Sequence, residues 1–321
     1  MKRDLRIIYM GTPEFAVEPL RQIIDAGYHV IAVITAPDKP AGRGQKIHFS
    51  PVKDFALSHS LIVLQPVNLK NPEFIKELES YKANLQVVVA FRMLPTIIWE
   101  MPEYGTLNLH ASLLPQYRGA APINHAILNG ETETGLTTFY IEKEIDTGNI
   151  ILSRKLPILP SDDAGKLHDR LSVEGGLLML ETLKLIETGN DKPMAQDGNI
   201  SSSLVLHPAP KIFKEDCRIN WNNPSKKIHD FIRGLSPFPS AFSTLVSADS
   251  VKQVKIFQTS YELKATKMVP GMILSDNKIA LSVFTQDGII HIEELQVEGK
   301  RRMSTADFLR GMPLIGLFHF E

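Results

Sequence analysis

An asparagine and a histidine two positions apart, Asn108 and His110, are the residues of this sequence best suited to chemistry. They follow the run 105–107 in a short apolar segment that is typical of a buried strand, so both side chains point to one face. An imidazole accepts or delivers a proton near neutral pH, and an amide N–H stabilises an oxyanion. A structural role, with Asn108 capping a turn and His110 hydrogen-bonded in the core, stays open at this point.

A carboxylate follows further along the chain, in a tight turn. The run 144–151 places Asp146 between two segments rich in β-forming residues. A carboxylate that reaches a histidine orients the imidazole ring, so the turn is a candidate third part of the same site. Ser112 has no second histidine nearby for a catalytic triad, and the ten histidines show no metal-binding set, so neither a serine hydrolase nor a metal site is expected.

Together with the loop 111–122 that follows His110, these segments resemble the formyltransferase family that uses 10-formyltetrahydrofolate. That family has Asn and His before an SLLP-x-x-RGAAP loop, and Asp-Thr-Gly at a similar distance beyond it. Three more segments resemble the branch of the family that formylates methionyl-tRNA, and the resemblance spans nearly the whole chain. These segments are 11–16, 37–44 and 234–239.

The resemblance implies transfer of the formyl group of 10-formyltetrahydrofolate to the α-amino group of methionyl-initiator-tRNA, in support of translation initiation. The amine would attack directly through a tetrahedral intermediate, with Asn108 as oxyanion donor and His110 as second donor or base. Asp146 would orient His110, and which of the two takes the amine proton is left open. The residues implied to bind the folate are Val89, Phe91, Ser112, Leu113, Leu114, Pro115 and Asp146.

A long basic loop offers a contact for the tRNA. From Lys39 to Lys53 the chain carries four basic residues and no acidic one, within a predicted loop from 36 to 51. A solvated connector and a loop that folds over a phosphate backbone both fit this composition. The resemblance favours tRNA binding by Lys39, Arg43 and Lys46, with Arg43 as the principal contact.

Alternating strands and helices over the first part of the chain predict an α/β fold. Strands at 5–9, 29–34 and 85–90 and helices at 51–58 and 72–80 indicate a Rossmann-like, mostly parallel sheet with helices on both faces. Only one glycine stands at the first strand–helix turn, so no dinucleotide is expected. Arg92, just beyond the strand at 85–90, departs from the family pattern and puts the details of the pterin pocket in doubt.

Short β-rich runs in the last third predict a small β-barrel, which the resemblance identifies as an OB-like tRNA-binding domain. The predicted domains are a catalytic domain at 1–189, a linker at 190–206 and the barrel at 207–321. From residue 207 onward, 15 lysines and arginines face 12 acidic residues, which favours a polyanionic partner although the whole chain has a net charge of −1.

The composition is that of an ordinary globular protein. The 321 residues are 43% hydrophobic and 22% charged, and Cys217 is the only cysteine. No run is apolar enough for a membrane helix, so a cytoplasmic monomer is expected. Three alternatives are weighed: a formyltransferase acting on a nucleotide-sugar amine, a formyltetrahydrofolate hydrolase, and a folate-binding protein without catalysis. The Asn/His/Asp set argues against the last, and the basic loop favours tRNA over the others.

Overall fold

The computed structural model describes residues 2–41, 46–196, 205–248, 250–314 and 318–321. The chain forms two compact units, the first from residues 1–119, 134–156 and 168–208, and the second from 120–133, 157–167 and 209–321. The predicted boundaries at 189 and 207 stay a prediction, and residues 197–204 of the predicted linker lie outside the described residues.

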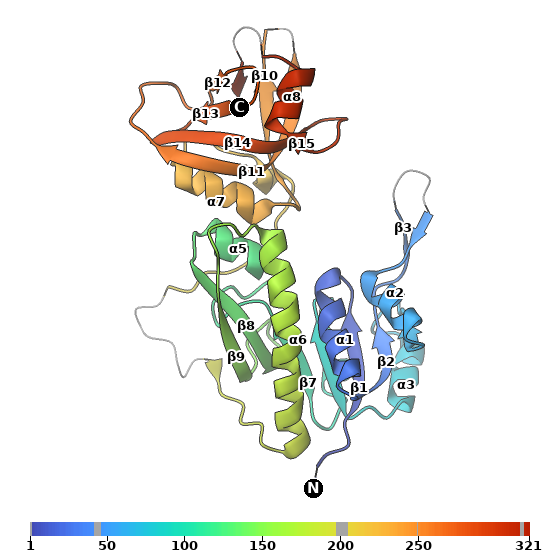
Figure 1. Cartoon of the computed structure of the whole chain (residues 1–321). Coiled ribbons are helices and arrows are strands. Elements are labelled where there is room, and N and C mark those ends of the chain that lie inside the picture. Colours follow the sequence, from blue (N-terminus) through green and yellow to red (C-terminus); the bar gives the residue numbers. More distant parts are fainter. Residues whose placement is uncertain (1, 42–45, 197–204, 249, 315–317) are drawn as a thin grey trace. The chain divides into compact units, whose positions relative to one another are not determined.

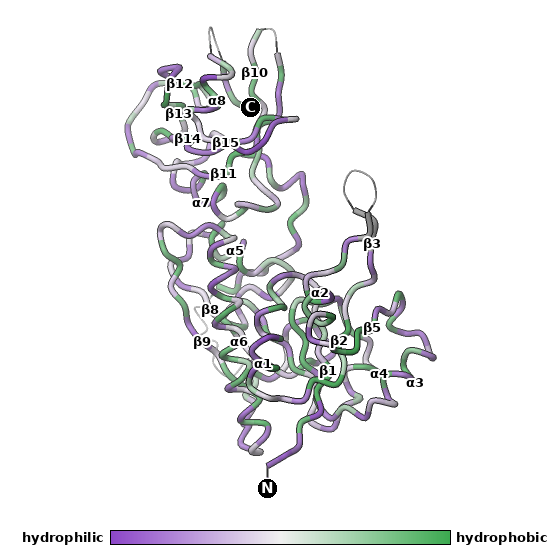
Figure 2. The backbone as a smooth tube through the Cα atoms, turned by 45° about the vertical axis from the view of Figure 1, so that its right-hand side comes forward, coloured by the Kyte–Doolittle hydropathy of each residue, from purple (hydrophilic) through white to green (hydrophobic). Residues whose placement is uncertain are grey.

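The first unit contains a seven-stranded sheet in the order β5-β2-β1-β6-β7-β8-β9. Figure 1 labels β2, β1, β7, β8 and β9 of this sheet. The strands β5, β2, β1, β6 and β7 are parallel, and β8 runs antiparallel to β7. Hydrophobic residues run along the central strands, as Figure 2 shows for β1. The bounds are β1 Arg6–Gly11, β2 His29–Ile34, β5 Ile62–Leu64, β6 Leu85–Val89, β7 Thr106–His110, β8 Glu133–Tyr140 and β9 Ile150–Pro157.

Helices cover both faces of this sheet. On one face, side chains of α3 and α4 pack with those of β1, β2 and β6 in a buried cluster. On the other face α6 approaches β7 and α1 closely, because a Cβ at Gly175 would lie 2.8 Å from Leu109 and one at Gly176 would lie 2.5 Å from Gln22. The helices are η1 Glu14–Ala16, α1 Val17–Asp25, α2 Pro51–Ser58, α3 Pro72–Ser80, α4 Thr96–Trp99 and α6 Ala164–Thr188.

The strand order reverses between β1 and β6, and this is where open α/β sheets bind ligands. Gly11 ends β1 at this point. A Cβ there would lie 2.7 Å from the Ala16 side chain and 3.0 Å from the Val89 carbonyl oxygen, so only glycine fits. The Rossmann-like sheet predicted from the sequence is therefore confirmed, with its carboxyl edge at the ends of β1, β6 and β7.

Residues 36–51, predicted as an irregular loop, contain a β-hairpin. The strands β3 Lys39–Ala41 and β4 Lys46–His48 pair antiparallel, with Lys39 opposite His48 and Ala41 opposite Lys46. Below the hairpin, the Asp38 carboxylate accepts hydrogen bonds from Lys53 Nζ at 2.5 Å and Gln65 Nε2 at 2.8 Å. The Asp38 carboxylate therefore connects the segment just before the hairpin to α2 and to the residue after β5.

The second unit contains a β-barrel. Its strands follow the order β12-β13-β14-β11-β10-β16, and a bridge between Met272 and His319 joins the last strand back to the start of the first. The OB-like barrel predicted from the sequence is confirmed. The bounds are β10 Ala241–Val246, β11 Val251–Leu263, β12 Ile273–Ser275, β13 Leu281–Phe284, β14 Gly288–Val297, β15 Met303–Ser304 and β16 His319–Phe320, with α5 Pro122–Leu128, η3 Glu215–Cys217, α7 Ser225–Leu235 and α8 Thr305–Gly311.

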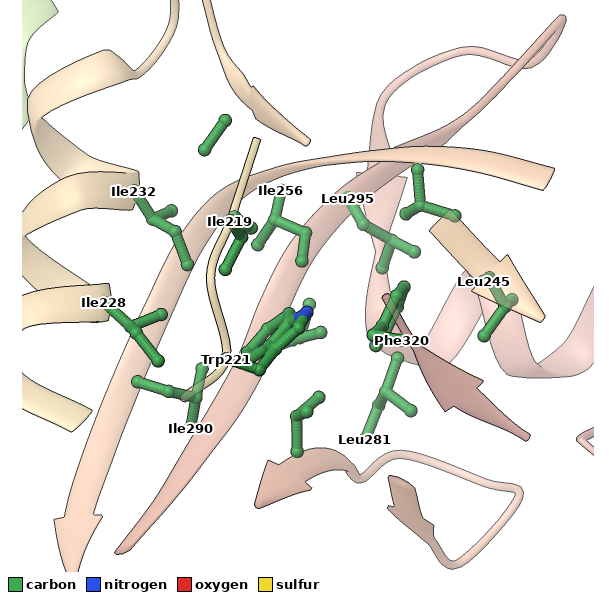
Figure 3. Packing of buried hydrophobic residues seen from close by; sticks show 14 of the residues in the cluster. Ile219, Trp221, Ile228, Ile232, Leu245, Ile256, Leu281, Ile290, Leu295 and Phe320 are labelled. Carbon is green, nitrogen blue, oxygen red and sulfur yellow. The ribbon is translucent and has the colours of Figure 1, made fainter. Parts of the chain in front are cut away.

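Two aromatic side chains stack in the barrel core (Figure 3). The rings of Trp221 and Phe320 have centroids 5.5 Å apart, and Trp221 Nε1 donates a 2.9 Å hydrogen bond to Ser243 Oγ. Ile228 and Ile232 of α7 join the same cluster, so the helix seals one side of the barrel. Every buried polar atom of Trp221 is satisfied, as a low-dielectric core requires.

Candidate active site

The strand β7 carries Asn108 and His110 to the carboxyl edge of the sheet. Asn108 pairs with Val88 of β6 across the parallel ladder, and Val88 belongs to the cluster under α3 and α4. Because paired residues share a face and positions two apart do too, Asn108 and His110 lie on the face opposite Leu109. Asn108 is half-buried and His110 is buried. Within the described residues, the Asn108 side-chain amide has no hydrogen-bond partner.

Two contacts fix the imidazole of His110. Its Nε2 atom lies 2.8 Å from the carbonyl oxygen of Tyr117, and its Nδ1 atom lies 3.8 Å from Oδ2 of Asp146. A carbonyl oxygen only accepts hydrogen bonds, so Nε2 must carry a hydrogen. The other ring nitrogen, Nδ1, faces the Asp146 carboxylate.

Asp146 lies in the turn between β8 and β9, in a left-handed backbone conformation with φ of 55°. This conformation is uncommon outside glycine and costs on the order of 1–3 kcal/mol, so other contacts must hold it. The backbone N–H of Gly119 donates a 2.9 Å hydrogen bond to Oδ2 of Asp146. Gly148 brings the turn against β8, because a Cβ there would lie 1.7 Å from the Tyr140 carbonyl oxygen.

The predicted folate-binding residues come from two adjacent strand ends and the Asp146 turn. Val89 ends β6 and Phe91 follows two positions later, while the loop 112–115 follows β7, the parallel neighbour of β6. Thr137 of β8 fixes this loop by donating to the Ser112 carbonyl oxygen at 2.7 Å and accepting from the Leu114 N–H at 3.1 Å. The structure thus brings the loop after β7 and the Asp146 side chain together beside His110, at the end of β7.

Several residues that organise the site escaped the sequence analysis. Tyr117 contributes a carbonyl oxygen, Thr137 a hydroxyl, and Gln196 a side-chain amide that bonds to the Asp146 turn from 50 positions away. A backbone contact leaves no mark on residue type, and a single glutamine in a polar segment carries no signal of its own. Only the folded chain reveals them.

The Arg92 side chain forms its hydrogen bonds with the segment after β5. Its guanidinium donates to the carbonyl oxygens of Val67, at 2.9 Å, and of Pro66. Burial lowers the pKa of Arg92 from its ordinary value. The Arg92 side chain, which departs from the family pattern, therefore connects the segment after β6 to the segment after β5.

The predicted tRNA-binding residues belong to the β-hairpin. Lys39 begins β3 and Lys46 begins β4, and Arg43 lies outside the described residues. In the described part of the chain, no group of three His, Cys, Asp or Glu side chains is arranged to hold a metal ion. None of the helices described is long and apolar enough to cross a membrane.

Comparison with known proteins defines the class. The model of the family described as formyl transferase matches residues 5–183, and that of the formyl transferase C-terminal domain matches residues 211–313. The chain therefore belongs to the formyl transferase family.

Within that family, the chain is similar to curated proteins named methionyl-tRNA formyltransferase. The protein of that name from Bacteroides thetaiotaomicron is 53% identical over 98% of this chain and 97% of its own length. The one from Porphyromonas gingivalis is 44% identical over 100% of this chain and 99% of its own. The resemblance predicted from the motifs is confirmed.

Solved structures share the fold at lower identity. HypX from Aquifex aeolicus in complex with tetrahydrofolic acid superposes with a TM-score of 0.63 at 20% identity, covering 96% of this chain and 47% of that one. The N-formyltransferase from Helicobacter canadensis, in complex with folinic acid and dTDP-3-aminofucose, has a TM-score of 0.63 at 23% identity, covering 90% and 98%. At these identities the likeness is one of fold.

Proposed function

We propose that this chain transfers the formyl group of 10-formyltetrahydrofolate to the α-amino group of methionyl-initiator-tRNA. The observation that carries the chemistry is the arrangement of Asn108, His110 and Asp146 at the carboxyl edge of the sheet. The substrate rests on relatives of that name that are about half identical over nearly the whole of both chains.

In the proposed reaction, the α-amino nitrogen attacks the formyl carbon and the carbonyl oxygen becomes an oxyanion. The side-chain amide of Asn108 donates a hydrogen bond to this oxygen. It is suited to do so because it has no partner in the described part of the protein. A donor held in place before the charge develops contributes roughly 10²–10³ in rate. The tetrahedral intermediate then breaks its bond to N10 of the folate, and that nitrogen takes a proton.

His110 handles the proton of the attacking amine. Its Nε2 hydrogen is held by the Tyr117 carbonyl oxygen, so the amine proton goes to Nδ1. Protonation makes the ring cationic, and Asp146, at 3.8 Å from Nδ1, stabilises that charge. The protonated Nδ1 then serves as the acid for the departing folate nitrogen.

The folate binds where the ends of β6 and β7 adjoin. We assign its binding to Val89 and Phe91 at and after the end of β6, to the loop from Ser112 to Pro115 after β7, and to Asp146. This placement suits a flat ring system, since strand ends offer backbone donors and acceptors in a row. Structures with this fold that hold tetrahydrofolic or folinic acid support the class of donor.

The tRNA is held in part by the hairpin of β3 and β4, through Lys39, Arg43 and Lys46. A run of basic residues with no acidic one suits a phosphate backbone. A nucleotide-sugar amine is the second candidate acceptor, because the Helicobacter canadensis enzyme solved with dTDP-3-aminofucose shares this fold. The far higher identity to the methionyl-tRNA enzymes favours tRNA.

A parallel acceptor assay tests the proposal. Labelled 10-formyltetrahydrofolate is offered with charged initiator methionyl-tRNA, free methionine or dTDP-3-aminofucose, and formate release is measured with no acceptor. We expect labelled formylmethionyl-tRNA as the main product. Preferential formylation of the sugar, or formate release at the same rate without an acceptor, would replace the proposed function by one of the alternatives.

A further inference from the structure

One buried side chain joins the loop after β7 to the turn that carries Asp146. Gln196 is only 4% exposed, although it lies in a polar segment between the two predicted domains. Its Nε2 atom donates to the carbonyl oxygens of Asp146 and Gly148, each at 2.9 Å. Both hydrogens of the amide are therefore used on the turn that carries the carboxylate.

The other end of the same amide is held by an arginine. Arg118 Nε and one terminal nitrogen donate to Oε1 of Gln196 at 3.1 and 2.6 Å. A guanidinium only donates, so the oxygen of the amide must face Arg118 and the nitrogen must face the turn. The orientation of the glutamine is fixed by chemistry.

Three consecutive residues, 117 to 119, each hold a different side chain of the site in place. The carbonyl of Tyr117 holds His110, the side chain of Arg118 holds Gln196, and the N–H of Gly119 holds the carboxylate of Asp146. The backbone carbonyl and the side-chain carboxylate of Asp146 are thus tied to the same short stretch of chain. This double attachment opposes the relaxation of a left-handed residue.

We infer that Gln196 is a positioning residue for formyl transfer, acting through Asp146. This inference rests on the proposed function. Gln196 does not reach the reacting atoms in this account; it keeps the carboxylate opposite Nδ1 of His110, where the cationic ring forms. Loss of its two donors would let the turn relax and move the carboxylate. A displacement of about 1 Å near the chemistry costs up to roughly 10²-fold in rate.

Two substitutions separate positioning from packing. Gln196→Ala removes all four hydrogen bonds, and Gln196→Glu keeps an oxygen for Arg118 but has no N–H for the turn. We expect kcat for methionyl-tRNA to fall roughly 10- to 100-fold in both variants, with KM for tRNA and folate changed less than about threefold. If Gln196→Glu keeps wild-type kcat, the donors to the turn do not matter and the inference is wrong.

Gln86 provides the matched control. It is 1% exposed on β6 and accepts a 3.0 Å hydrogen bond from Thr106, and among the described residues its side chain makes no hydrogen bond to the Asp146 turn. Gln86→Ala deletes the same side chain from a buried site in the same unit. We expect it to lower the thermal midpoint without lowering kcat. An equal fall of kcat in both alanine variants would make the effect one of general stability and overturn the inference.

A second readout does not need the reaction. The Gly119 N–H donates to Oδ2 of Asp146, so its hydrogen exchange reports whether the carboxylate is held. We expect exchange at Gly119 to quicken roughly tenfold or more in Gln196→Ala and not in Gln86→Ala. Unchanged exchange together with unchanged kcat overturns the inference. If the wild type fails to formylate methionyl-tRNA, the proposed function is wrong. Hydrogen exchange at Gly119 still tests whether Gln196 holds the Asp146 carboxylate in place.

Discussion

Nδ1 of His110 lies 3.8 Å from Oδ2 of Asp146, although the two residues are separated by a loop, a helix and a full strand of the sheet. The same Oδ2 accepts the Gly119 N–H, so the carboxylate has one oxygen turned toward both the loop and the imidazole. This relationship places the Asp146 carboxylate beside the imidazole nitrogen that does not contact the Tyr117 carbonyl oxygen.

Asn108 tests the oxyanion part of the mechanism. Asn108→Asp keeps the size of the side chain but replaces the amide N–H by an acceptor, so it cannot stabilise an oxyanion. We expect kcat to fall on the order of 10²–10³, and Asn108→Ala to fall by a similar factor. Thermal unfolding should shift little in Asn108→Ala, because the amide has no partner in the described residues. Full turnover by the aspartate variant would remove Asn108 from the mechanism.

Gly148 tests how the turn is built. A Cβ at this position would lie 1.7 Å from the Tyr140 carbonyl oxygen, so Gly148→Ala must push β8 and the turn apart. We expect a cost of about 3 kcal/mol and a fall in the thermal midpoint of roughly 6–12 °C. Gly311→Ala is the control, since nothing lies within 4 Å of a Cβ there. Equal midpoints for the two variants would contradict the close approach.

Asp38 gives a pH-dependent prediction. Hydrogen bonds from Lys53 and then Gln65 hold the pKa of Asp38 below its ordinary value. A lowered carboxyl pKa contributes stability above the ordinary value of about 3.9, and this contribution is lost as pH falls through the lower, folded-state pKa. Asp38→Asn should therefore lower the thermal midpoint at pH 7, and the difference from wild type should shrink as pH falls below about 3.9. A difference that stays constant over this range would refute the assignment.

Arg43 tests the role of the hairpin in tRNA binding. An arginine grips phosphate through two parallel hydrogen bonds, which a lysine does not reproduce. We expect Arg43→Ala to raise KM for methionyl-tRNA strongly, Arg43→Lys to restore part of the loss, and folate affinity to stay unchanged. The deficit relative to wild type should narrow as salt rises. If folate affinity falls instead, the hairpin serves the other substrate.

Local signals explain why much of the fold was predictable from the sequence. The helices α2 and α3 were predicted with their observed bounds because each begins with a proline after a capping residue. Ser50 Oγ accepts the Lys53 N–H at 3.1 Å, and Asn71 Oδ1 accepts the Glu73 N–H at 2.9 Å. The apolar run over 85–89 likewise predicted a buried parallel strand.

Very short elements and contacts between distant segments were not predictable from the sequence. The hairpin of β3 and β4 has strands of three residues each, too short to show alternation, and one of them contains Pro40. The three-residue strand β12 and the four-residue helix α4 are likewise too short to show a periodic pattern. In the candidate site, residue types predicted Asn108, His110 and Asp146, and the structure places His110 Nδ1 3.8 Å from Asp146 Oδ2. The contacts of Tyr117 and Gln196 arise only when distant segments meet.

The most direct measurement of the central claim is single-turnover formyl transfer to charged initiator methionyl-tRNA by the wild type and by His110→Ala. Excess enzyme removes differences in substrate binding, so the rate reports the chemical step. We expect rapid formylation by the wild type and a rate lower by about 10²–10⁴ for the variant, with the folded structure retained in both. A folded His110→Ala protein that formylates methionyl-tRNA at the wild-type rate would contradict it.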